Sequence, residues 1–337
     1  MGNDKIGVIS DMFIIEVLIL IVLAVIVMLL FNLRKRSKKL KRNIREIRDS
    51  INNNTKELSN STKAINTLLN IPEVKKVGMF NFGVYSMGLL LKDNPNVILK
   101  PDNSIEVYGI KFKYFTAFVL SEVFGRKDYE FGGLDGCIFI DVGANVADST
   151  LYAASLPNVE YVYGYELMPS TYEQAKVNLS LNPNLAEKIT LFNYGWYNKN
   201  SSMTTNDVVS NSGLNSIEDT AIDSFYYQRE LGRSEALQVE VSLKESRKEL
   251  LSILEKHPTS PIILKIDIEG AEYECLENMG NLIAHVDIIL LEWHYRGYES
   301  IVELLEQNNF VWFHEILTTG TGYIKAYNTK KKPFGSD

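Results

Sequence analysis

The chain has 337 residues, of which 45% are hydrophobic and 23% charged, and its formal net charge is -7. This composition excludes disordered and fibrous proteins, and the length allows one sizeable domain plus an appendage. Residues 34–48 hold nine Lys or Arg against one Glu, a local charge of +8 that leaves -15 on the rest of the chain, and such an acidic main body argues against nucleic-acid binding.

An apolar block at residues 12–33 follows a short tail at residues 1–11, and its single charged residue is Glu16. At about 1.5 Å per residue, a helix of this length is roughly 33 Å long and can cross a bilayer. A cleaved signal peptide is disfavoured because no small-residue cleavage site follows. The basic residues after the block favour an outside N-terminus. The sequence therefore predicts a single-pass membrane protein whose large domain is cytoplasmic.

Residues 34–71 are predicted to form a basic flank and a coiled-coil-like stalk. Between residues 40 and 68 apolar side chains recur at seven-residue spacing, and the polar Asn54 and Ser61 interrupt one of the two apolar positions. A short parallel coiled coil would join copies into a homo-oligomer. A single solvated helix fits the same pattern, and the sequence leaves the two interpretations open.

A lead-in subdomain is predicted at residues 78–136. Its apolar residues alternate at 97–99 and 105–112 around a turn at 101–103, which indicates a hairpin. Helical spacing follows at residues 114–124.

Residues 137–166 read as a βαβ unit. An apolar run ends at Asp141, a loop with Gly143 follows, a helix begins near Asp148, and a second strand at 161–165 ends at Glu166. Gly143 has no Cβ and lets backbone approach a ligand, the helix N-terminus offers N–H groups, and Glu166 can accept hydrogen bonds from ribose hydroxyls.

The loop lacks the G-x-G-x-x-G pattern of dinucleotide-binding folds, because Asn145 and Ala147 stand where the later glycines would be. A pyrophosphate fits poorly there, which disfavours a nicotinamide-dependent dehydrogenase. The cationic, phosphate-free S-adenosylmethionine fits better.

Downstream, strands and helices continue to alternate. The two cysteines, Cys137 and Cys275, lie in apolar patterns, which predicts buried thiols rather than a disulfide. Residues 198–233 are polar and too long for a simple connection, so an acceptor-recognition segment is favoured. Strands are predicted at 189–193, 235–242, 262–267 and 288–291, helices at 169–181, 243–256, 272–282 and 300–308, and a closing hairpin at 310–316 and 323–327.

Four stretches, DVGANVADSTL, YGYELMPSTYEQAKVNLSLN, ILKIDIEGAEYECLENM and IILLEWH, closely resemble the FkbM-type methyltransferases. The resemblance covers roughly residues 110–327 and departs from the family at Ala147, where glycine is usual. It implies an α/β fold with a seven-stranded, doubly wound, Rossmann-like sheet ending in an antiparallel hairpin. The corresponding methyltransferase domain is residues 137–328, followed by a tail at 329–337.

The same resemblance implies where S-adenosylmethionine binds. The expected cofactor-binding residues are Asp141, Gly143, Ala144, Asn145, Glu166, Leu167, Asn193 and Tyr194. Asn193 is expected to bind the adenine amine, and Tyr194 or Trp196 to stack on the ring. A plain loop with packed aromatic side chains is the alternative.

Acidic residues and a histidine mark the expected catalytic group. Asp267 and Glu269 would point to one face if their strand persists that far, and His294 leaves the neighbouring strand. Asp267 or His294 could act as general base, or Asp267, Glu269 and His294 could hold a divalent cation. For Glu272 we expect a structural role at the start of the next helix.

These features predict a membrane-anchored, S-adenosylmethionine-dependent O-methyltransferase. Its acceptor would be a hydroxyl of a small molecule, a sugar or a lipid-linked glycan. The alternative is a catalytically inactive scaffold with a methyltransferase fold, tethered to the membrane and joined to other copies through the stalk.

Overall fold

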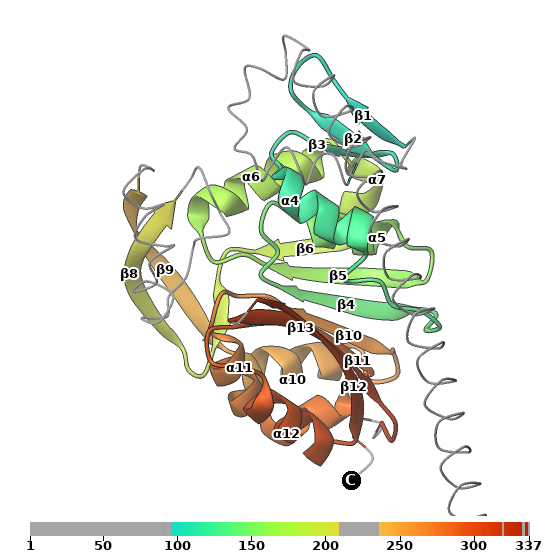
Figure 1. The fold of residues 1–337 in the computed structure, drawn as a ribbon, viewed down its shortest axis with the longest axis vertical. Coiled ribbons are helices and arrows are strands. Elements are labelled where there is room, and N and C mark those ends of the chain that lie inside the picture. The colour runs from blue at the N-terminus through green and yellow to red at the C-terminus, as the bar shows by residue number, and fades with distance from the viewer. Residues whose placement is uncertain (1–89, 91–95, 209–235, 319, 332–333, 336–337) are drawn as a thin grey trace, which may run out of the picture. The chain divides into compact units, whose positions relative to one another are not determined.

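The computed structural model describes residue 90 and residues 96–208, 236–318, 320–331 and 334–335 (Figure 1). The predicted membrane helix at 12–33 and the stalk at 34–71 lie outside the described residues, as does the polar segment from residue 209 onward. Within the described part of the chain, no helix has the length and apolarity needed to span a membrane.

A seven-stranded sheet forms the centre of the described domain (Figure 1). Its strand order is β12-β13-β11-β10-β4-β5-β6. The strands are β4 (Cys137–Val142), β5 (Val159–Tyr165), β6 (Ile189–Phe192), β10 (Ile262–Ile266), β11 (Ile288–His294), β12 (Phe310–Thr318) and β13 (Thr321–Asn328). Strands β11, β10, β4, β5 and β6 are parallel, whereas β13 runs antiparallel to β11 and β12. The predicted parallel sheet with a closing antiparallel hairpin is confirmed.

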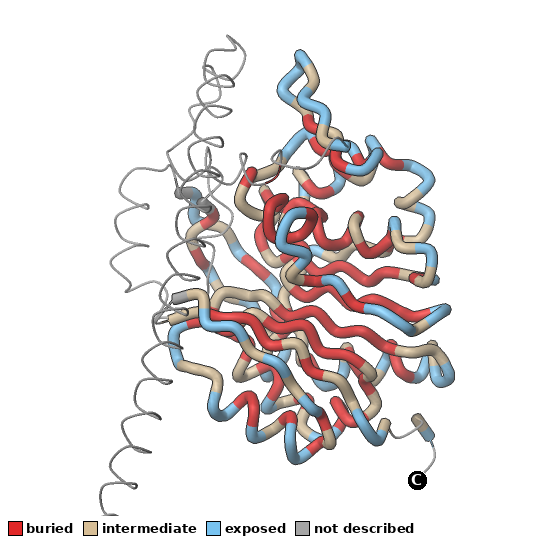
Figure 2. The backbone as a smooth tube through the Cα atoms, turned by 45° about the vertical axis from the view of Figure 1, so that its right-hand side comes forward, coloured by how far each residue is buried: buried red, intermediate tan, exposed pale blue. Residues whose placement is uncertain are grey.

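Helices cover both faces of this sheet (Figure 1). One face carries α4 (Ala117–Leu120), α5 (Asp148–Ser155), α6 (Pro169–Ser180) and α7 (Pro183–Ala186), and the other carries α10 (Ser246–Lys256), α11 (Glu272–Met279) and α12 (Glu299–Gln307). Phe139 of β4 packs in one apolar cluster with Leu151, and Ile140 packs in the other with Leu250. Both faces of the sheet are covered, so every residue of β4 and β10 is buried, and the two strands are apolar except for Asp141 and Lys265 near their carboxyl ends (Figure 2).

The lead-in region differs from the expected single hairpin. It forms three short antiparallel strands, β1 (Val97–Leu99), β2 (Ile105–Val107) and β3 (Ile110–Phe112). Tyr108 and Gly109 take φ values of 51° and 83° and turn the chain between β2 and β3, as tight hairpin turns require. The predicted helix at 114–124 is also different, because α4 passes into a π-helical segment, η1 (Ser121–Arg126).

A second three-stranded sheet contains β7 (Gly195–Tyr197), β8 (Ser201–Val208) and β9 (Ala236–Glu245), in the order β7-β9-β8. Trp196 therefore belongs to a strand rather than to the expected exit loop, and the polar segment predicted at 198–233 contains β8 near its start. Its role in acceptor recognition stays a prediction. The sequence of β8 conceals the strand, because it is mostly polar and pairs with a strand distant in sequence. Asp207 ties β8 to α6 by accepting hydrogen bonds from the backbone N–H and hydroxyl of Ser170.

Candidate active site

The site lies at the carboxyl ends of β4 and β10, which are adjacent although they are distant in sequence. From β4 the chain proceeds to β5 and β6 on one side, and later to β10 and β11 on the other. Ligands of open α/β sheets bind at such a reversal of strand order.

The structure shows why a residue without a side chain is needed at position 143. A Cβ at this position would lie 1.8 Å from the backbone oxygen of Asp267, and the residue has a φ of 89°. Its missing side chain therefore makes room for the neighbouring loop, and its predicted contact with the cofactor stays a prediction. The consequence is that the two strand-end loops touch, which holds the expected cofactor side and catalytic side of the site together.

Glu166 lies beside the loop that follows β4. Its carboxylate accepts hydrogen bonds from the backbone N–H groups of Asn145 and Met168, both at 2.8 Å. Only 8% of the residue is exposed, and burial raises its pKa to about 8 although the two N–H groups oppose the shift. The side chain is thus held at the end of β5, next to the loop that should bind the cofactor.

Ala147, which stands where the family usually has glycine, takes a left-handed backbone with φ 68° and ψ 31° just before α5. Glycine adopts this conformation more readily. The methyl group is fully buried in the same apolar cluster as Leu151. It therefore fills core space at the start of α5. Ala144 in the same loop is also fully buried.

Asp141 is fully buried and has partners within the protein. Its Oδ2 accepts hydrogen bonds from the hydroxyls of Ser149 and Thr150 at 2.7 and 2.6 Å, and the Lys265 ammonium lies 3.0 Å from Oδ1. These contacts join β4 to α5 and β10. Its predicted contact with the cofactor stays a prediction.

Lys265 connects the two sides of the site. Its ammonium donates to the backbone oxygen of Gly143 at 2.6 Å and lies 3.7 Å from Oδ2 of Asp267. Burial acts against the positive charge, but Asp141 and Asp267 outweigh it and raise the pKa of Lys265. The lysine is therefore charged and offsets part of the negative charge at this edge.

Asn193 holds the exits of β5 and β6 together. Its side-chain amide donates to the backbone oxygens of Glu166 and Leu167 at 2.9 and 3.1 Å. The carboxamide oxygen is an acceptor, which is what an adenine amine requires. The predicted adenine contact is compatible with this orientation and stays a prediction.

The aromatic residues after Asn193 pack inside the protein. Tyr194 donates its hydroxyl to Glu249, and its ring lies 5.4 Å from that of Tyr165. Trp196 is 1% exposed and lies 4.9 Å from Tyr165. This geometry favours the alternative of packed aromatic side chains over stacking on adenine.

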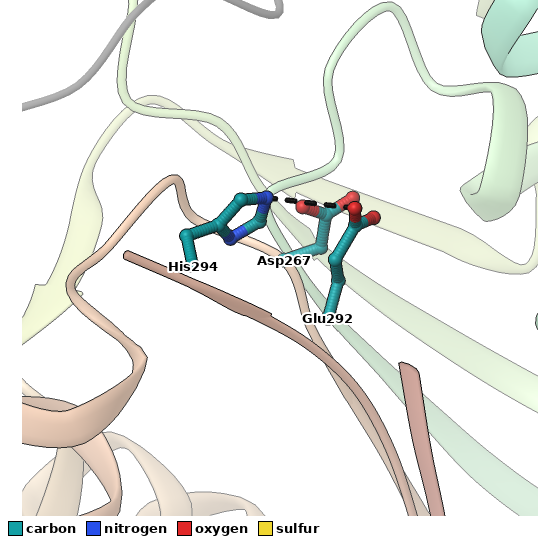
Figure 3. A group of neighbouring side chains, drawn as sticks. All are labelled: Asp267, Glu292 and His294. Atoms are coloured by element: carbon teal, nitrogen blue, oxygen red, sulfur yellow. Dashed lines mark ion pairs between the residues drawn. The ribbon is translucent and has the colours of Figure 1, made fainter. Parts of the chain in front are cut away.

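A compact group of metal-ligating side chains lies across from the cofactor loop: Asp267, Glu292 and His294 (Figure 3). One ligand atom of each lies within 4.8 Å of the other two. Nε2 of His294 is 3.5 Å from Glu292 and 3.6 Å from Glu269. Donors at such spacings can share one cation.

Glu292 replaces Glu269 in the predicted trio for a structural reason. Strand β10 ends at Ile266, and Glu269 has a φ of 54°, so the expected strand alternation between Asp267 and Glu269 does not hold. Strand β11 instead continues to His294. Glu292 and His294 are two residues apart on that strand and therefore share a face.

Glu272 fixes the His294 ring. The Glu272 carboxylate is fully buried, lies 2.8 Å from Nδ1 of His294, and accepts hydrogen bonds from the backbone N–H groups of Ile268 and Gly270. The structural role expected for Glu272 thus includes the imidazole as well as the loop. Burial lowers the pKa of His294, but Glu269 and Glu272 outweigh it and hold the pKa well above its usual value.

Sequence reasoning missed two residues from before β4. The Tyr129 hydroxyl donates to Oδ2 of Asp267 at 2.9 Å. Glu122, 5% exposed, accepts a hydrogen bond from Tyr323 of β13, and burial together with Glu292 and Asp267 raises its pKa to about 9. No local pattern marks these residues, whereas the spacing of Glu292 and His294 on one strand could have revealed Glu292.

Comparison with known families agrees with this geometry. The sequence profile of the methyltransferase FkbM domain family matches residues 141–313, just over half of the chain. The chain belongs to the FkbM methyltransferase family. It is accordingly an S-adenosylmethionine-dependent methyltransferase by family, and the resemblance seen in its four motifs is confirmed. No curated protein matches this FkbM-family chain.

Several solved structures are similar to this FkbM-family methyltransferase in fold. A methyltransferase FkbM from Methylobacillus flagellatus KT is 13% identical, with 80% of this chain and 59% of that chain covered and a TM-score of 0.39. A protein of the NADB-Rossmann superfamily from Streptococcus agalactiae is 15% identical, with 60% and 66% covered and a TM-score of 0.36. A putative tRNA (m1A22) methyltransferase from Streptococcus pneumoniae in complex with S-adenosyl-L-methionine is 14% identical, with 59% of this chain and 69% of that chain covered and a TM-score of 0.33. The chain thus spans less than two thirds of the first two proteins.

The residues at the cofactor edge fit the cofactor of the family. Two buried oxygens beside the loop, Oδ1 of Asn145 and Oδ2 of Asp148, have no hydrogen-bond partner within the described part of the chain. Buried acceptors of this kind are costly unless a donor reaches them. The ammonium group of S-adenosylmethionine is such a donor, and the expected role of Glu166 in binding its ribose hydroxyls stays a prediction.

Proposed function

We propose that the protein is an O-methyltransferase that acts on a hydroxyl of a sugar or lipid-linked glycan at the cytoplasmic face of a membrane. The observation that carries the proposal is the contact between the loop at Gly143 and the loop at Asp267. It sets a group of proton- and cation-binding side chains directly beside the expected cofactor loop.

The chemistry explains why such a group is needed. Bound S-adenosylmethionine supplies a methyl group on a positively charged sulfur. As the acceptor oxygen bonds to the methyl carbon, the carbon–sulfur bond breaks, its electrons remain on sulfur, and the hydroxyl proton must leave. Asp267, Glu292 and His294 can take that proton or stabilise the oxygen as it loses it.

We further propose that a divalent cation binds Asp267, Glu292 and His294. Two carboxylates and an imidazole suit Mg²⁺ or Mn²⁺, and three protein ligands leave positions open for an acceptor hydroxyl. The bound cation would lower the pKa of that hydroxyl. The surrounding carboxylates favour positive charge at this point, because they raise the pKa of His294, and a cation would take the place of that proton.

The membrane location rests on the sequence alone. The apolar block at residues 12–33 and the basic tract after it favour a single span with residues 137–328 in the cytoplasm. An anchored enzyme meets acceptors that are themselves in the membrane, which favours a lipid-linked glycan over a free sugar.

Mass spectrometry of membrane lipids and glycans tests this function. Membranes from cells that make the full chain should contain a species heavier by one CH₂ group, which is missing from cells without it. The Asp267→Asn variant should not form this species. Glu303→Gln, which removes an exposed carboxylate on α12, is the matched control and should form it. Absence of the species with the wild-type chain, or its undiminished formation by Asp267→Asn, would argue against the proposal.

A further inference from the structure

Tyr129 lies outside the region matched to the family, yet it reaches the proposed cation site. It follows η1 and precedes residue 141, where the family match begins. The residue is 3% exposed. A buried tyrosine hydroxyl normally needs a hydrogen-bond partner, and the partner here is Oδ2 of Asp267 at 2.9 Å.

The position of Asp267 depends on this contact. The Asp267 residue follows the end of β10, so the strand ladder does not hold its side chain. Two donors lie on Oδ2: the Tyr129 hydroxyl at 2.9 Å and the Lys265 ammonium at 3.7 Å. Oδ2 is thus held from the protein side, and a carboxylate oxygen of Asp267 lies within 4.8 Å of the ligand atoms of Glu292 and His294 (Figure 3).

The tyrosine is itself fixed by its neighbours. Its ring packs edge-on against Tyr323 at 6.1 Å, and the Lys265 ammonium lies 5.1 Å from its centre. Tyr323 donates in turn to Glu122 at 3.0 Å.

We infer that Tyr129 is a positioning residue that orients Asp267 for the cation, so that the segment before the family-matched domain completes the active site. This inference rests on the proposed cation site. Phenylalanine would fill the same core volume as Tyr129, and only the hydroxyl group reaches Asp267. Partners that orient a metal ligand in this way typically contribute about 10- to 100-fold to metal affinity.

The test compares Tyr129→Phe with wild type and with Tyr152→Phe, a matched control in which the tyrosine is on α5 and packs against Phe124. Binding of Mn²⁺ to the full chain in detergent is measured from the electron paramagnetic resonance signal of the free ion. Calorimetry with S-adenosylhomocysteine and thermal unfolding serve as readouts that the hydroxyl should not affect.

Tyr129→Phe is expected to bind Mn²⁺ at least about tenfold more weakly than wild type. Its affinity for S-adenosylhomocysteine should be unchanged, and Tyr152→Phe should behave like wild type in all three measurements. Equal Mn²⁺ affinity in Tyr129→Phe and wild type would overturn the inference. So would a loss of cofactor affinity and thermal stability in parallel with the loss of Mn²⁺, because that pattern indicates general damage. Failure of the wild-type chain to bind Mn²⁺ would instead refute the cation site, and the inference with it.

Discussion

Replacing Glu166 by Gln should lower the stability of the protein at mildly acidic pH and raise it at alkaline pH. Burial raises the pKa of this carboxyl from an ordinary 4.5 to about 8. The folded protein therefore holds the proton more tightly than the unfolded chain does. Stability is highest below pH 4.5, falls as pH rises towards 8, and stays low above it, because the buried carboxylate is then ionised.

The structure gives the size of this effect. At about 1.4 kcal/mol per pKa unit, ionising Glu166 in the folded state costs nearly 5 kcal/mol at about pH 9 and under about 1 kcal/mol at about pH 5. Gln avoids this cost but turns an NH₂ group towards the backbone N–H of Asn145 or Met168, a loss of about 1–3 kcal/mol at every pH. The variant should thus be less stable than wild type near pH 5 and more stable near pH 9.

Urea unfolding of the full chain, followed by tryptophan fluorescence, measures this difference. All three tryptophans, Trp196, Trp293 and Trp312, lie in strands of the described domain. We expect the stability difference between Glu166→Gln and wild type to change by about 4 kcal/mol over this pH range. Glu303→Gln controls for the loss of one surface charge. The same difference at both pH values would refute the reasoning that burial raises the pKa of Glu166.

Three further predictions concern the packing of the described domain. Ala147→Gly should relieve about 1–2 kcal/mol of strain in the left-handed backbone. It also removes a buried methyl group and makes the unfolded chain more flexible, which together cost a similar amount. Urea unfolding should therefore show a net change in stability under about 1 kcal/mol. Ala144→Gly, equally buried but without a left-handed backbone, should lose about 1–2 kcal/mol, and equal effects at the two sites would contradict this reasoning. Asn178→Ala removes four hydrogen bonds to backbone groups of Lys113, Tyr114 and Val146, three part-buried and one buried, and should cost at least about 2 kcal/mol in the same assay; a loss under about 1 kcal/mol would contradict the network. Cys137, whose pKa burial raises to about 11, and the buried Cys275 should resist alkylation until the protein is unfolded, and mass spectrometry that finds either modified in the native protein would show that the thiols are accessible.

The central sheet could be predicted because its strands are buried on both faces. A strand such as β4 then begins with an apolar run, residues 137–140, and the polar Asp141 near its end marks the edge of the sheet. The starts of two helices could also be predicted, because α5 begins at Asp148 and α6 at Pro169, as the sequence indicated. The prediction that Cys137 and Cys275 are buried thiols rather than a disulfide is also confirmed.

The features that the sequence did not predict share a physical cause, because contacts between residues distant in sequence determine the structure there. Strand β8 is polar and gains its pairing only from β9. At Gly143 a side chain is excluded by the backbone of Asp267, more than a hundred residues away. No periodicity within a short window carries this information.

Calorimetry of S-adenosylhomocysteine with the full chain tests the central claim most directly, namely that the cofactor binds between the loop after β4 and Glu166. Wild type and Glu303→Gln should bind alike, and Glu166→Ala should bind at least about tenfold more weakly, because hydrogen bonds between a carboxylate and hydroxyls contribute about 1.5–3 kcal/mol. The absence of binding to wild type, or equal affinity in Glu166→Ala, would contradict the account.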